Sequence, residues 1–109
     1  MTVSSIKQGR NSRDPVCPLG VPLLARQLAA GIASANTALS TTAWAISIRA
    51  VTADIRFSIG STSQTANATT SHFIAAGERL EFRLGVATPN IGVIRAGATN
   101  GVLEVTELQ

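Results

Sequence analysis

The chain has 109 residues, of which 45% are apolar, and a formal net charge of +3. This length allows one modest hydrophobic core and no second one. The single cysteine, Cys17, excludes an internal disulfide and a cysteine-based zinc site. No apolar run approaches the roughly 20 residues that a membrane-spanning helix needs, so we expect no membrane as a partner.

The positive charge is concentrated in the N-terminal segment. Asp14 is the only carboxylate among residues 1–26, whereas carboxylates balance arginines in residues 27–109. Pro15 and Pro18 interrupt the segment, which has no sustained period of 2 or 3.6 residues, so we expect an arm that an external acidic surface orders. Four cations without interleaved aromatic residues can contact phosphates, but they offer no ring on which a base can stack. Nucleic acid is therefore not the expected partner. The candidate contact residues are Lys7, Arg10, Arg13 and Arg26.

Residues 22–35, "PLLARQLAAGIASA", predict a short helix, because Pro22 suits a first helical turn and alanine is abundant. An extended segment lying against another subunit is an equal alternative. The apolar run is interrupted by Arg26 and Gln27, so a secretory signal peptide is not expected. Residues 36–42 are typical of a connector. We therefore divide the chain into an N-terminal basic arm and connector, residues 1–42, and a β-domain, residues 43–109.

From Ala43 onward, short segments alternate between apolar and polar residues and are separated by turn residues. In "AWAISIRAV" the alternation places Trp44, Ile46 and Ile48 on one face. At the end of the chain, Asn100-Gly101 predicts a type I′ turn that joins the last two segments into a hairpin. Six such segments without an intervening helix predict an all-β fold, a small antiparallel β-sandwich or jelly roll preceded by an extended N-terminal arm.

Several of these segments are apolar on both faces. In residues 90–96, Ile91 and Val93 alternate with Ile94. In the strand that carries Trp44, small apolar residues lie on the face opposite to Trp44. A second buried surface is therefore predicted, most simply another copy of the same chain. The candidates for the core or for an oligomer contact are Trp44, Ile91, Val93 and Ile94.

The sequence predicts no catalytic residue, no metal site and no cofactor. His72 is the only histidine, and the adjacent Ser71 is expected on the opposite face of its strand, so the two do not form a nucleophile–base pair. The polar loop, residues 61–71, predicts a flexible connector, with weak carbohydrate contacts as the alternative. The carboxylates of the β-domain are expected on solvated faces or in cross-strand pairs: Asp54, Glu78, Glu81, Glu104 and Glu107.

The stretches "IRFSIG", "SHFIAAGERLEFRL", "IGVIRAG" and "GVLEVTEL" resemble small virion proteins of tailed bacteriophages, in particular capsid decoration or cement proteins. The resemblance covers about Trp44 to Leu108. It implies a non-enzymatic β-domain on the outer capsid surface, which binds the major capsid protein and stabilises the shell as a homo-oligomer, with a trimer favoured over a dimer. A tail or fibre accessory protein is the alternative, and a small glycan-binding module is the third hypothesis.

Overall fold

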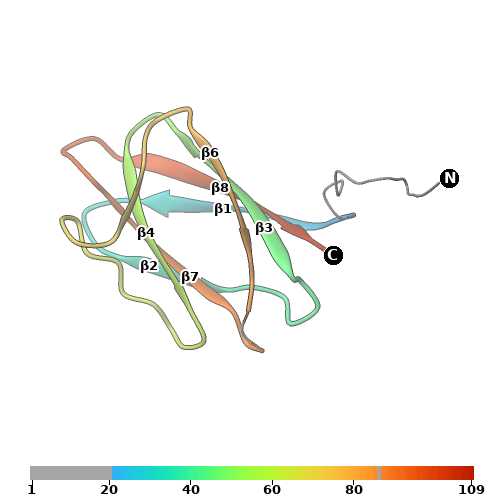
Figure 1. Ribbon diagram of the computed structural model, residues 1–109. Coiled ribbons are helices and arrows are strands. Elements are labelled where there is room, and N and C mark those ends of the chain that lie inside the picture. Colours follow the sequence, from blue (N-terminus) through green and yellow to red (C-terminus); the bar gives the residue numbers. More distant parts are fainter. Residues whose placement is uncertain (1–20, 86) are drawn as a thin grey trace, which may run out of the picture.

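The computed structural model describes residues 21–85 and 87–109, and eight strands occupy them (Figure 1). No α-helix is present in this part of the chain, and hence none long and apolar enough to cross a membrane. The strands are β1 (Pro22–Ala30), β2 (Ala35–Ala38), β3 (Ala45–Val51), β4 (Ile55–Gly60), β5 (His72–Ile74), β6 (Arg79–Arg83), β7 (Asn90–Arg95) and β8 (Gly101–Leu108).

The strands form two four-stranded antiparallel sheets, with the orders β1-β8-β3-β6 and β2-β7-β4-β5. Most connections cross from one sheet to the other, and only β4 and β5 are consecutive strands that pair directly. Two facing sheets of four strands with these crossings form a jelly roll. The structure confirms the predicted all-β sandwich.

The core lies between the two sheets and is built from the alternating inward positions of the central strands. Ile46 and Ile48 of β3 face the interior, while the intervening Ser47 lies on the outer face, where its hydroxyl accepts a hydrogen bond from Arg79. The opposite sheet contributes Ile91 and Val93 of β7, which are also fully buried. Period-2 alternation thus explains why these segments fold as strands rather than as helices.

The helix predicted over residues 22–35 is wrong. Residues 22–30 form β1, which pairs antiparallel with β8 from Ala25 to Ala30, and β2 pairs with β7. Leu28 and Ala30 are buried against the core on alternate positions, and this burial together with the pairing outweighs the helix propensity of the alanines. The sheets therefore begin at Pro22, and residues 22–38 belong to the β-domain rather than to the connector.

The predicted terminal hairpin is also wrong. β7 and β8 lie in different sheets, so the segment from Ala96 to Asn100 carries the chain across the sandwich. Gly101 begins β8, and among the described residues a positive φ occurs only at Thr52 and Gly77. The Asn100-Gly101 pair correctly marks a reversal of direction, but the sheet that each strand joins is decided by packing between distant segments.

Candidate functional site

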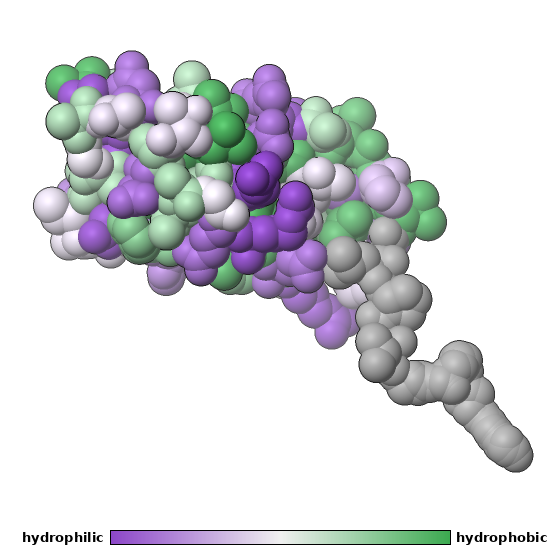
Figure 2. All heavy atoms as spheres, turned by 90° about the horizontal axis from the view of Figure 1, so that it is seen from above, coloured by the Kyte–Doolittle hydropathy of each residue, from purple (hydrophilic) through white to green (hydrophobic). Residues whose placement is uncertain are grey.

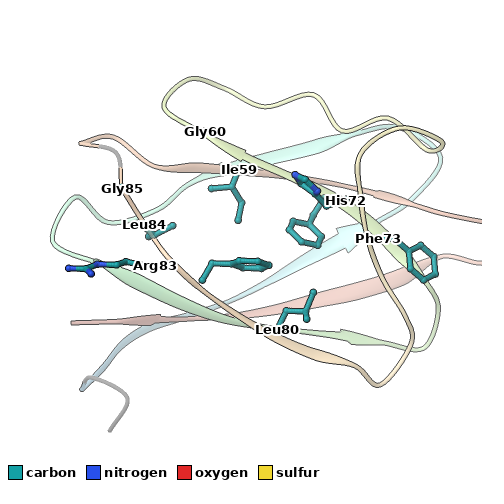
Figure 3. A pocket seen from close by; sticks show the side chains of 10 residues that line it. Ile59, Gly60, His72, Phe73, Leu80, Arg83, Leu84 and Gly85 are labelled. Carbon is teal, nitrogen blue, oxygen red and sulfur yellow. The ribbon is translucent and has the colours of Figure 1, made fainter. Parts of the chain in front are cut away.

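The edge cavity is a hollow of about 490 Å³ in the described part of the domain, and it opens between β5 and β6. These two strands are the outer strands of opposite sheets, and they do not pair with one another. Figure 3 shows Ile59, His72, Leu80 and Leu84 turned toward the common space, whereas Arg83 and Phe73 point away from it. The cavity is therefore an open side of the sandwich that gives access to the edge of the core.

Four aromatic residues line the edge cavity, and the rings of two of them, His72 and Phe82, pack against that of Phe57. The Phe57 ring lies 5.6 Å from the His72 ring and 5.6 Å from the Phe82 ring, centroid to centroid, and both pairs are tilted. Such separations are typical of favourable aromatic pairs. Phe57 is buried, Phe82 is half-buried and His72 is exposed, so the rings run from the core to the rim. This surface suits an apolar or proline-rich group.

Of the described residues that line the cavity, His72 and Arg83 have titratable side chains, and only that of His72 is turned toward the cavity (Figure 3). Its neighbour Ser71 accepts a hydrogen bond at its hydroxyl from the Asn67 backbone N–H, and no hydrogen bond joins Ser71 to His72 among the described residues. Within residues 21–85 and 87–109, no three side chains of His, Cys, Asp or Glu come together as metal ligands. The cavity therefore offers contact surface rather than a proton-transfer pair.

An apolar patch, the arm-end surface, lies where the described chain begins. Val21 exchanges two backbone hydrogen bonds with Gln109, and the Trp44 N–H donates to the Leu108 carbonyl, so Val21, the C-terminal residue and Trp44 share this end of the domain. Figure 2 shows hydrophobic residues gathered there beside a hydrophilic band. The exposed apolar residues that define the surface are Val21, Leu23, Leu24 and Trp44.

Trp44 is 46% exposed, so its interpretation as a core residue is wrong. The guanidinium of Arg83 lies 5.6 Å from the centre of its ring, within the range of a cation–π contact. β3 begins one residue later, at Ala45, so Trp44 lies just outside the alternation that buries Ile46. Trp44 as an oligomer contact stays a prediction.

The other predicted site residues lie in different places. Ile91 and Val93 are fully buried in the core, whereas Ile94 is half-buried on the opposite face of β7. Arg26 belongs to β1, where its side chain pairs with a carboxylate. Lys7, Arg10 and Arg13 lie outside the described residues.

A buried ion pair joins β1 to β8 near the arm-end surface. Arg26 Nε donates to Glu107 Oε2 at 2.6 Å, and the Ser40 backbone N–H donates to the same oxygen at 3.3 Å. Burial raises the pKa of Glu107, but the hydrogen bonds from Ser40 and Arg26 and the charge of Arg26 outweigh it, and the pKa lies below its ordinary value. Glu107 is 0% exposed, so of its two expected positions the solvated face is wrong, and the structure shows a cross-strand pair instead.

The other carboxylates hold positions near the surface. Asp54, Glu78 and Glu81 are exposed, and Glu104 is half-buried on the outer face of β8. Two of them fix loops: Asp54 accepts the Ala76 N–H, and Glu78 accepts the N–H of residue 75.

The polar loop, residues 61–71, lies across the outer face of the sheet β2-β7-β4-β5. The Gln64 backbone N–H donates to Asn36 Oδ1 at 2.8 Å, and the Ser58 hydroxyl donates to the Gln64 side chain. Gly92 makes this approach feasible, because a Cβ there would lie 2.7 Å from the Gln64 carbonyl oxygen. The loop is thus a hydrogen-bonded cover rather than the expected flexible connector, and it covers part of the second face that was assigned to another copy.

A solved structure is similar to this domain. It is the solution NMR structure of a de novo designed double-stranded β-helix, with a TM-score of 0.54 and 14% sequence identity. The similarity covers 78% of this chain and 99% of the designed chain. No protein-family model and no curated protein matches the chain. At this identity the likeness shows the fold alone.

Proposed function

We propose that the chain is a structural protein of a bacteriophage virion, of the capsid decoration or cement type, and that it binds the outer shell through one end of the domain. The observation that carries this proposal is the arm-end surface. Four exposed apolar side chains surround the point at which a basic segment joins β1. Apolar contacts combined with a segment rich in cations match a protein partner with an acidic surface.

The residues before Gln27 carry the entire net charge of the chain. Lys7, Arg10 and Arg13 are the cations that remain for an external partner, because Arg26 is engaged by Glu107 inside the domain. In this proposal the arm supplies orientation and electrostatic attraction, and the apolar surface supplies the desolvated contact. The major capsid protein is the proposed partner, and the virion surface is the proposed location.

The test measures binding of the purified chain to capsids that lack it. We expect deletion of residues 1–20 to abolish firm binding while leaving a β-rich domain, and charge reversal at Lys7, Arg10 and Arg13 to weaken binding at least ten-fold at low salt, where exposed charges are least screened. Arg49→Glu is the control for these charge reversals, because it reverses an exposed charge in the middle of β3 instead of in the arm. Equal occupancy by the full-length and truncated chains would overturn the assignment of the arm.

The exposure of Trp44 favours a glycan-binding module as a second candidate, because an exposed indole is a platform on which a sugar ring can stack. Arg83 lies over this ring and limits the platform. A glycan-binding module would retain its sugar affinity after deletion of residues 1–20 and would lose it in Trp44→Ala. A virion protein of the decoration type would instead lose capsid binding after deletion of residues 1–20.

A further inference from the structure

The edge cavity is large for a domain of this size and is lined mainly by apolar groups. Folded proteins are packed as densely as organic crystals and contain few voids larger than a water molecule. A volume of about 490 Å³ is roughly three times that of an apolar cavity that accepts benzene. Its rings and aliphatic side chains offer water few hydrogen-bond partners, and these properties favour an apolar occupant.

The shape of the cavity favours an extended chain segment. It lies between two strands, β5 and β6, which each have an unpaired edge, and it is lined by Phe57, His72 and Phe82. Aromatic-lined grooves are the usual docking sites for proline-rich segments, because proline presets an extended conformation and lowers the entropy lost on binding.

The chain itself contains such a segment. Residues 15–19 read "PVCPL", a P-x-x-P pattern with Val16 and Leu19 as additional apolar groups, and they end two residues before the described domain begins at Val21. The basic residues that the proposed function assigns to the capsid all precede Pro15. We propose that residues 15–19 of one copy dock in the edge cavity of a neighbouring copy, so that copies of the chain exchange arms.

The geometry favours a neighbouring copy over the same chain. Pro22, Leu108, Ala45 and Arg83 lie in one row across four adjacent strands, and three strand spacings place Arg83 about 14 Å from Pro22. Pro18 precedes Pro22 by four residues, which span at most about 14 Å when fully extended. Docking in the same domain would need a reversal beside Val21, which still pairs with Gln109, and then a fully extended chain. A neighbour's segment is under neither constraint.

This inference rests on the proposed function, because the resemblance to decoration proteins implies a homo-oligomer, and disulfide trapping tests it on the purified full-length chain. Cys17 is the only cysteine and lies within the docking segment. Gly85 lines the cavity, Gly97 lies between β7 and β8 at the opposite end of the domain, and a Cβ at either glycine would meet no atom within 4 Å. Gly85→Cys therefore places a thiol at the site, and Gly97→Cys is its matched control.

We expect mild oxidation to link Gly85→Cys chains into covalent dimers and larger species at least ten-fold faster than Gly97→Cys chains. Docking holds the two thiols at an effective concentration near millimolar, well above that of a micromolar protein. Adding Val16→Asp to Gly85→Cys should slow the linkage at least five-fold, because a carboxylate is costly to bury in an apolar cavity.

Equal rates for Gly85→Cys and Gly97→Cys, or a link formed only within one chain, would overturn the exchange. Because the measurement contains no capsids, a failure here would leave the capsid-binding test unaffected. Conversely, a chain that links as expected but does not bind capsids would contradict the proposed function and not the exchange.

Discussion

Glu107 is a charged side chain enclosed between the two sheets, and it determines how β1 is held at the base of the arm. Its position follows from β8 itself: Leu103 and Val105 face the core, and period-2 alternation places Glu107 on the same face. The charge of Glu107 favours a solvated face, but its position in the alternation of β8 decides where it lies. Arg26 lies inward on β1 by the same alternation and supplies the partner charge.

We expect Glu107→Gln to lower the free energy of unfolding by about 2 kcal/mol, because the substitution leaves Arg26 without its counter-charge inside the domain. Arg26 is 27% exposed, so the loss should stay below that of a fully enclosed pair. Glu104→Gln is the control, since Glu104 lies on the outer face of β8 and bonds only Gln27. Urea unfolding of both variants measures the difference, and equal midpoints would contradict the role of the pair.

The same pair predicts a pH dependence. The pKa of Glu107 is lower in the folded domain than its ordinary value of 4.5, so the unfolded chain binds this proton more readily than the folded chain does. The contribution of Glu107 to stability is therefore complete above about pH 4.5 and is lost as the pH falls through the folded-state pKa. Urea midpoints of the wild type and Glu107→Gln should converge over this acidic range, and a constant difference would exclude the linkage.

At the scale of single elements, the polar loop acts as a second layer on one sheet. Its small uncharged side chains allow its backbone to lie close to β7, and Gly60 and Gly92 provide the space beneath it. Gln64 is held there by hydrogen bonds to β2 and β4. The loop thus covers part of the outer face of β7 that was expected to lie against a second copy of the chain.

We expect Gly92→Ala to destabilise the domain by about 1–3 kcal/mol, because the new methyl group would displace the Gln64 backbone. Gly97→Ala is the control, since nothing lies within 4 Å of its Cβ position. Thermal unfolding should show a lower midpoint for Gly92→Ala alone, and limited proteolysis should cleave within residues 61–71 more rapidly. Unchanged proteolysis would mean that the loop does not depend on this contact.

The elements differ in how far their own sequences determine them. Strands β3 to β8 are predictable because their alternation is local, whereas β1 has an alanine-rich sequence that suits either a helix or a strand and is decided by its pairing with β8. The pairing partner of β8 cannot be derived from the Asn100-Gly101 turn, because a turn specifies a reversal and not a sheet. The edge cavity likewise depends on three distant strands, β4, β5 and β6, of which β5 has only three residues and leaves a hollow beside the buried Phe57 and the half-buried Phe82.

At the scale of the whole molecule, the domain has two apolar regions that its own sheets do not cover. These are the arm-end surface and the edge cavity, and Trp44 connects them because its carbonyl accepts the Leu84 N–H at the cavity wall. A domain of this size buries only about 60–65% of the surface of its unfolded chain, so further burial against other copies adds a substantial fraction of its stability. Association between copies would cover the edge cavity and the adjoining Trp44, whereas the rest of the arm-end surface would remain available to the capsid.

We therefore expect the full-length chain to sediment as a homo-oligomer at micromolar concentration, with a trimer favoured over a dimer on the resemblance to decoration proteins. Trp44→Asp places a charge on the arm-end surface and should shift the chain toward monomers without changing its β-sheet circular dichroism. Thr99→Asp is the matched control, because Thr99 is exposed in the loop before β8, at the opposite end of the domain. Trp44 is the only tryptophan, so its fluorescence should shift to shorter wavelengths as the wild type associates. A folded wild-type monomer that persists at micromolar concentration would contradict the oligomer, and the arm exchange would fall with it.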